Sequence, residues 1–234
     1  MSLSIQDLKH IFDLALKNYQ KGNFKKAEML YNKILKNFPD HFQSIFLLGT
    51  LFAQVKNYKG AINLLKKAIQ INPAYLDAHN NLGNVYREIG SNQKAISCYQ
   101  KIIKIDSNYV EAHNNLGKIY NEIGKYSEAI SYYKAVIRIN PQYVDAHNNL
   151  GALLQQQGKY QEALNSYNQA IKINPRYLEA YTNIGNVLND LGKHSEAIKI
   201  FQKANEINPN YLTSHWLSLN TFPIIYKNTK ELGF

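Results

Sequence analysis

Apolar residues recur along most of the chain at the spacing of three and four residues that is typical of amphipathic α-helices. The helical runs come in pairs, and in the stretch 110–143 they read VEAHNNLGKIYNEI and YSEAISYYKAVIRI. Gly124 stands between these two runs, where a residue of left-handed conformation ends a helix, and Pro141 closes the second run. The pattern therefore predicts a series of helical hairpins.

The hairpin pattern repeats every 34 residues. The string AHNNLG begins at residues 78, 112 and 146, and looser copies begin at residues 44 and 180. This register divides the chain into six blocks, which are 8–41, 42–75, 76–109, 110–143, 144–177 and 178–211. We number the positions of each block from 1 to 34, so that the two helical runs fall at about positions 1–14 and 17–30.

Small residues recur where the two helices of a hairpin have to cross. Position 20 is alanine in all six blocks, and position 8 is glycine in five of them. A larger side chain at either position would push the helices apart. Because one hairpin cannot bury its apolar face alone, the pattern predicts an all-α solenoid in which successive hairpins stack.

The repeat resembles the tetratricopeptide repeat family. The likeness rests on the small residues at positions 8 and 20, on leucine at position 7 and on tyrosine at positions 11 and 24, and it spans residues 8–211. It implies a right-handed superhelical solenoid of six helix–turn–helix repeats, whose first helices line a concave surface. Residues 1–7 are expected to form a short N-terminal lead-in.

The C-terminal stretch 212–234 carries a less complete pattern. LTSHWLSLN begins a further helix, in which Trp216 and Leu219 can cover the last block, and Pro223 interrupts it. We expect a C-terminal helix that acts as a cap or a linker. A terminal repeat normally ends in a polar cap. The apolar, unfinished end therefore indicates either a fragment of a longer protein or an edge that a second subunit of a homo-oligomer covers.

Asparagine occupies the positions that the resemblance places on the concave surface. The predicted peptide-binding residues are Asn80, Asn81, Asn84, Asn114, Asn115, Asn148, Asn149, Asn183 and Asn186. A carboxamide has one acceptor oxygen and two donor hydrogens, and the peptide backbone offers the complementary groups. The sequence therefore predicts a groove that holds an extended polypeptide with little regard to its side chains. The alternative is a polar surface, typical of the family, that fixes neighbouring helices.

A similar asparagine ladder occurs in the repeat domain of O-linked N-acetylglucosamine transferases, where it holds substrate polypeptide. The match is at position 6, and it comprises Asn81, Asn115, Asn149 and Asn183. It does not extend to the first two blocks, where position 6 is Asp13 and Leu47. The resemblance implies substrate recruitment for an attached or associated glycosyltransferase.

Apolar side chains take the inner positions of the first two blocks. Phe12, Phe46 and Leu47 stand where later blocks carry polar residues. These three residues predict either an apolar pocket for a partner's side chain or helix, or a patch that the N-terminal segment or another copy of the chain covers.

The charges are segregated between the two helices of each block. The chain has a net charge of +10, but the inner positions of blocks three to six carry seven acidic residues, which are Asp77, Glu88, Glu111, Glu122, Asp145, Glu179 and Asp190. Lysine is concentrated on the second helices. We therefore expect a neutral or cationic partner in the groove and a basic outer face. Nucleic acid is disfavoured, because a site that follows its backbone needs positive charge beside stacking aromatic residues.

Nothing in the sequence predicts catalysis, a metal or a cofactor. His79, His113 and His147 recur once per block, about 10 Å apart by helix packing, which is too far for one shared ion. Cys98, the single cysteine, has no arrangement of nucleophile and base around it. With no secretory signal and no long apolar run, the expected setting is cytoplasmic, without a membrane.

Two functions therefore remain open. The first is a non-enzymatic protein-interaction module that holds a polypeptide along the asparagines. The second is a structural assembly scaffold, or a self-associating repeat protein, that acts through its edges and its basic convex face.

Overall fold

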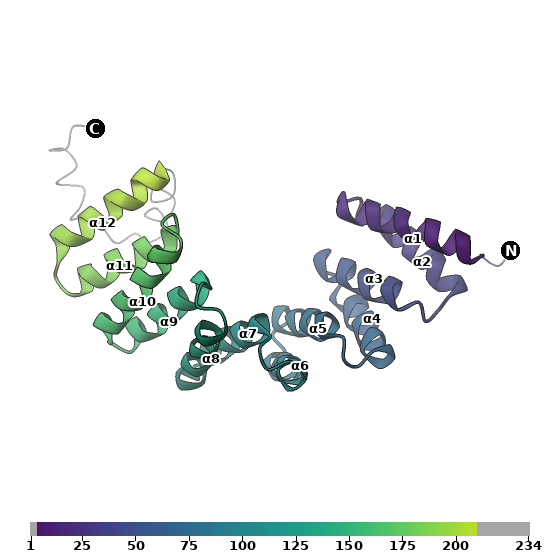
Figure 1. The fold of residues 1–234 in the computed structure, drawn as a ribbon, viewed down its shortest axis with the longest axis horizontal. Helices are drawn as coiled ribbons and strands as arrows, with labels where there is room; N and C mark the ends of the chain where they lie inside the picture. The colour runs from purple at the N-terminus through teal and green to yellow at the C-terminus, as the bar shows by residue number, and fades with distance from the viewer. Residues whose placement is uncertain (1–3, 210–234) are drawn as a thin grey trace. The chain divides into compact units, whose positions relative to one another are not determined.

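The computed structural model describes residues 4–209, and within that range it contains twelve α-helices and no strand (Figure 1). The helices are α1 (Ile5–Gln20), α2 (Phe24–Asn37), α3 (Phe42–Gln54), α4 (Tyr58–Ile71), α5 (Leu76–Glu88), α6 (Asn92–Ile105), α7 (Val110–Glu122), α8 (Tyr126–Ile139), α9 (Val144–Gln156), α10 (Tyr160–Ile173), α11 (Leu178–Asp190) and α12 (His194–Ile207). The all-α fold is confirmed. The cap or linker expected at 212–234, with its C-terminal helix, lies outside the described residues.

The chain divides into two compact units, residues 1–124 and 125–234. The first unit holds α1 to α7, and the described part of the second holds α8 to α12. In both units a first helix packs against the second helix of its own block, as α5 does on α6 and α9 does on α10. Each second helix also packs on the first helix of the next block, as α4 does on α5. The right-handed superhelix remains a prediction from the family resemblance.

A glycine at position 15 ends the first helix in five blocks. These glycines have positive φ angles between 72° and 76°, and they are Gly22, Gly90, Gly124, Gly158 and Gly192. In the second block Lys56 takes the same conformation, with φ of 61°. The left-handed conformation brings Cβ close to the backbone in every residue except glycine. Block two therefore keeps the turn geometry at a cost in stability.

We expect Lys56→Gly to raise the free energy of unfolding of the protein by about 1 kcal/mol, because it removes the strain of a side chain at positive φ. Chemical denaturation measures the change. Gly90→Lys makes the reverse replacement at the same position of the next block and should lower stability by a similar amount. A Lys56→Gly variant no more stable than the parent, or a Gly90→Lys variant that loses no stability, would show that the turn is not strained.

In blocks three to six the residue at position 4 fixes the first helix to the turn that precedes it. The Nε2 atom of His79 lies 2.8 Å from the carbonyl oxygen of Pro73, and His147 makes the same bond to Pro141 at 3.0 Å. In the last block Tyr181 donates its hydroxyl to the equivalent carbonyl, that of Pro175, at 3.1 Å. A carbonyl oxygen only accepts, so Nε2 carries the proton in these histidines. Their repeated occurrence is thus explained by the turn.

Candidate peptide-binding surface

The nine predicted asparagines lie on the first helices α5, α7, α9 and α11. Eight of them are half-buried, with part of the side chain open to solvent. Asn114 differs, because it is only 4% exposed. The asparagines therefore contribute unequally to the surface, and Asn114 offers little of its side chain to a ligand.

In the N-terminal unit the amide of Asn115 bridges two repeats. Its Nδ2 atom donates to Oδ1 of Asn80 and to Oδ1 of Asn84, at 3.3 Å in both cases. An amide nitrogen carries two hydrogens, so these two bonds use both. One repeat earlier, Asn81 donates from Nδ2 to Oγ1 of Thr50 at 3.0 Å. The donor side of position 6 thus points to the preceding repeat.

The C-terminal unit repeats the same link. Nδ2 of Asn183 donates to Oδ1 of Asn148 at 3.0 Å. Asn183 stands at position 6 and Asn148 at position 5 of the block before it, which is the relation that joins Asn115 to Asn80. These hydrogen bonds link the first helices of neighbouring blocks, and each bond orders both of its partners.

The same hydrogen bonds leave half of each carboxamide unused. Among the described residues, no hydrogen bond engages Oδ1 of Asn81, Asn115 or Asn183, and none of these atoms is buried. The converse holds at position 5, where Asn80 and Asn148 accept through Oδ1 and keep Nδ2 unpaired and accessible. Each linked pair thus presents one acceptor and one donor to solvent, in an orientation that the link fixes.

Tyrosines of the second helices donate hydrogen bonds to further side-chain amides on the first helices. The Tyr99 hydroxyl donates to Oδ1 of Asn84 at 2.6 Å, and the Tyr167 hydroxyl donates to Oε1 of Gln155 at 2.9 Å. Burial raises the pKa of both phenols, so they remain donors at neutral pH. This support was not predicted from the sequence. Its signal is a tyrosine at position 24 with an asparagine at position 9 or a glutamine at position 12 of the same block.

The first block lacks that support. Tyr31 is fully buried, and its hydroxyl has no hydrogen-bond partner. The residues at positions 9 and 12 of this block are Leu16 and Tyr19, and neither places an acceptor carboxamide above the phenol. A buried hydroxyl without a partner lowers stability.

Tyr99→Phe is expected to lower the free energy of unfolding by about 1 kcal/mol, because it removes a short hydrogen bond and an ordering contact of Asn84. Tyr31→Phe should leave stability unchanged or raise it by up to about 1 kcal/mol, because the phenol it removes is unpaired. Urea denaturation of the two variants measures both values. A loss in Tyr31→Phe as large as the loss in Tyr99→Phe would contradict this assignment.

Two of the three apolar residues of the predicted pocket, Phe12 and Phe46, belong to aromatic clusters. The ring of Phe12 meets His41 edge-on with centroids 5.4 Å apart, and Phe46 meets Tyr75 in the same way at 4.9 Å. Leu47 packs against the core of the first two blocks. All three are half-buried, so their exposed edges are small. A pocket for a partner at Phe12, Phe46 and Leu47 remains a prediction.

Acidic side chains flank the asparagines at the start of each first helix. Asp77 and Asp145 each accept a hydrogen bond from the tyrosine that ends their own block, Tyr109 at 3.2 Å and Tyr177 at 2.9 Å. Burial, together with the charge of Asp77, raises the pKa of Tyr109 to about 12. Carboxylates in the first turn also interact favourably with the helix dipole. Both carboxylates remain exposed, so they add negative charge beside the asparagines.

The described residues show little that could support other chemistry. Burial raises the pKa of the Cys98 thiol to about 11, so the reactive thiolate is rare at neutral pH. Within residues 4–209, no three side chains of histidine, cysteine, aspartate or glutamate come together as metal ligands would. None of the described helices combines the length and the apolar character needed to cross a bilayer.

The stacked hairpins with a 34-residue period place the chain among the helical-repeat proteins. Models of the repeat match nearly all of that array, namely the TPR repeat at 49–90, 83–122 and 117–158, and the tetratricopeptide repeat at 12–41, 144–177 and 178–211. The chain belongs to the tetratricopeptide repeat family, whose members are protein-interaction modules. No curated protein matches its sequence.

Several solved structures are similar to this chain. MamA is 29% identical with a TM-score of 0.65, and the match covers 71% of this chain and 97% of MamA. PilF of Pseudomonas aeruginosa is 18% identical with a TM-score of 0.73, covering 92% and 97% of the two chains. YrrB, described as a TPR protein with an unusual peptide-binding site, is 19% identical with a TM-score of 0.62, covering 81% and 98%. The likeness to PilF and YrrB is one of fold.

Proposed function

We propose that this protein is a non-enzymatic interaction module that holds an extended polypeptide along the asparagines of its first helices. In this proposal Oδ1 at position 6 accepts from a peptide N–H, and Nδ2 at position 5 or 9 donates to a peptide carbonyl. The observation that carries it is the repeated link from Asn115 to Asn80 and from Asn183 to Asn148, which leaves one donor and one acceptor unpaired in each pair. Asn149 and Asn186 are proposed to add equivalent groups.

The energetics require several repeats to act together. A hydrogen bond contributes about 0.5–1.5 kcal/mol net, and ordering the peptide opposes it. Binding also costs entropy when side chains of the protein become ordered. The hydrogen bonds between repeats reduce this cost, because a side chain that is already fixed loses little rotamer freedom on binding. The exposed carboxylates, such as Asp77 and Asp145, then favour a ligand without net negative charge.

A more specific form of the proposal is substrate recruitment for a glycosyltransferase in a cytoplasmic setting. Its support is the sequence likeness at Asn81, Asn115, Asn149 and Asn183, and the comparisons add none. The fold likeness to YrrB concerns the scaffold and not its binding site, since the two chains are 19% identical.

An assembly scaffold is the second candidate function. It is favoured by two apolar side chains on the N-terminal hairpin, Ile5 and Met29, which are 81% and 61% exposed. Large exposed apolar side chains at a terminal repeat suit contact with another subunit. A mass that rises with concentration in sedimentation, and that Met29→Lys returns to the monomer, would favour this function.

The main proposal is tested with labelled peptides of serine and valine in which the third residue type is lysine or glutamate. Fluorescence anisotropy gives the affinity, and the side-chain amide signals of asparagine in NMR spectra give the site. We expect the lysine peptide to bind more tightly than the glutamate peptide and to shift the Asn80, Asn115, Asn148 and Asn183 signals. Binding of both peptides without any change in these signals would reject the asparagine surface as the site.

A further inference from the structure

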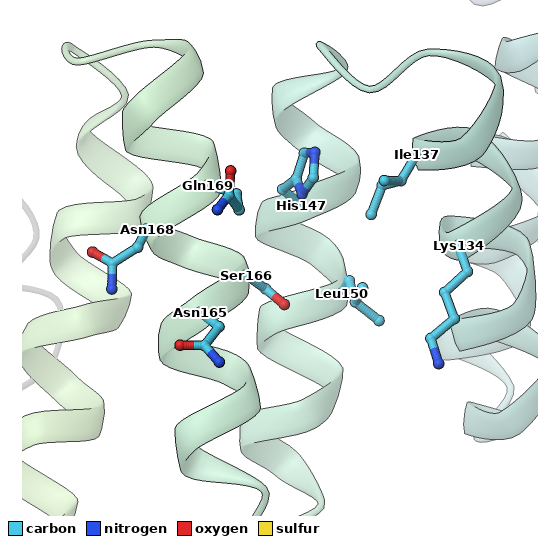
Figure 2. Close-up of a pocket in the computed structure, with 8 residues that line it drawn as sticks. All are labelled: Lys134, Ile137, His147, Leu150, Asn165, Ser166, Asn168 and Gln169. Atoms are coloured by element: carbon cyan, nitrogen blue, oxygen red, sulfur yellow. The ribbon is translucent and has the colours of Figure 1, made fainter.

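The C-terminal unit contains a pocket that the asparagine surface does not use. It has a volume of about 490 Å³ and lies between α8, α9 and α10 (Figure 2). Ile137 of α8 and Leu150 of α9 supply its apolar part. The polar lining residues are Lys134, His147, Asn165, Ser166, Asn168 and Gln169. The residues from α8 and α10 belong to second helices, whereas the predicted peptide-binding asparagines belong to first helices.

A small residue at position 23 makes room for this pocket. Ser166 is the smallest side chain at that position, where the other blocks carry Leu30, Leu64, Cys98, Tyr132 and Ile200. In the third block the corresponding residues are closed to solvent, with Cys98 8% and His79 3% exposed. Ser166 and His147 remain half-buried at the same two positions of the fifth block. Tyr181 and Ile200 of the sixth block are half-buried as well, so what sets the fifth block apart is the small side chain of Ser166.

The polar groups of the pocket are largely unpaired. Among the described residues, no hydrogen bond engages the side-chain amides of Asn168 and Gln169, and no carboxylate forms an ion pair with Lys134. Ser166 donates its hydroxyl to the carbonyl of Glu162 at 3.0 Å and keeps its acceptor capacity. The pocket thus combines an apolar floor with donors and acceptors that are available to a ligand.

The lining of the pocket carries one positive charge and no negative charge. Lys134 is the one charged residue in the lining, and Arg138 and Lys172 lie one turn further along α8 and α10, exposed at the ends of these helices. The acidic residues of the two helices, Glu128 and Glu162, lie in their first turns, at the opposite ends. The pocket and its basic end are complementary to a ligand with negative charge.

We propose that this pocket binds an acidic polypeptide segment of a partner protein. One aliphatic side chain of the segment packs on Ile137 and Leu150, a neighbouring carboxylate pairs with Lys134, and the amides of Asn168 and Gln169 bind the backbone. A polypeptide fits better than a nucleic acid, because the lining contains no Phe, Tyr or Trp for bases to stack on and only one cation. Together with the proposed asparagine surface, the pocket would let the protein join two partners of opposite charge preference.

The test uses a labelled peptide in which leucine stands between glutamates, and a matched peptide in which lysine replaces glutamate. NMR side-chain amide signals locate binding, and anisotropy measures it. We expect the acidic peptide to shift the signals of Asn168 and Gln169. Lys134→Glu should weaken the binding of the acidic peptide about tenfold or more, as loss of a charge-assisted contact does. Ser166→Leu, which places in the pocket the residue that block two carries at Leu64, should abolish binding with helicity unchanged.

Lys203→Glu on α12 is the matched control, because it makes the same charge change on a second helix outside the pocket. It should leave the affinity of the acidic peptide within about twofold, the range of long-range surface electrostatics in salt. If Lys203→Glu and Lys134→Glu weakened binding equally, the peptide would be held by the net charge of the protein and not by the pocket, and the proposal would be overturned. An absence of shifts at Asn168 and Gln169 would also overturn it, as would a single-stranded oligothymidine that shifts them while the acidic peptide does not.

Discussion

Replacing Gly151 with leucine is expected to lower the free energy of unfolding by about 3 kcal/mol, the upper range for overpacking a core. A Cβ atom at Gly151 would lie 2.6 Å from Cε1 and 2.8 Å from Cδ1 of Tyr167. The Tyr167 ring is fully buried, and its hydroxyl is bound to Gln155 at 2.9 Å, so it cannot move aside without losing that bond. Denaturation followed by circular dichroism measures the loss.

Two further variants show whether the ring is the obstacle. Tyr167→Ala removes it, so Gly151→Leu should cost much less in that background than alone. Ala15→Gly removes the single Cβ atom at the same position of block one, where Ala15 and Tyr31 belong to one buried cluster. It should cost only the difference in helix propensity, about 1 kcal/mol. Simple addition of the Gly151→Leu and Tyr167→Ala costs would mean that the new side chain meets something else.

Replacing Asn115 and Asn183 together by alanine is expected to weaken peptide binding by about tenfold or more. Each change removes a free acceptor, worth about 1 kcal/mol, and also releases the neighbouring asparagine that it holds in place. Isothermal titration with the lysine-containing peptide measures the affinity, and circular dichroism checks that helicity is retained. The affinity should be measured at low temperature, where both the variant and the parent are folded, so that the loss reflects binding and not unfolding.

Two controls separate binding from folding in this experiment. Asn115→Asp keeps an acceptor oxygen but loses the amide donor to Asn80 and Asn84, so it should lose stability and keep most of the affinity for a cationic peptide. Asn37→Ala, on α2, makes the same truncation outside the candidate surface, at a residue whose amide donates to the Lys33 carbonyl. It should leave binding unchanged. An affinity of the double alanine variant equal to that of the parent would reject the role of these asparagines.

The helices could be predicted closely from the sequence, because their limits depend on local residues. The second run of the fourth block was expected at positions 17–30, and α8 spans Tyr126–Ile139, the same residues. Gly124 takes the positive φ, 76°, that its place between the runs predicts. Lys56 shows the limit of such local rules, since the turn forms there without glycine because the flanking helices impose it.

The partners of the amides could not be predicted from the pattern. The sequence shows asparagine at position 6, but which half of Asn115 faces its neighbour depends on distances between repeats that the sequence does not contain. The burial of Asn114 and the pocket at Ser166 have the same origin, because both depend on the volume left by side chains from three helices. The tyrosine supports were missed because each joins two helices of a block through a single long side chain.

The most direct test of the central claim is the affinity of a peptide whose backbone N–H groups are methylated one at a time. If free Oδ1 atoms of asparagine hold the ligand's main chain, methylation at the contacted residues should weaken binding about fivefold to tenfold each, whatever side chains the peptide carries. Titration of the same peptides, with uncharged side chains exchanged for other uncharged ones and the backbone left intact, should give nearly constant affinity. Affinity that follows the side chains and ignores backbone methylation would contradict the proposed mode of binding.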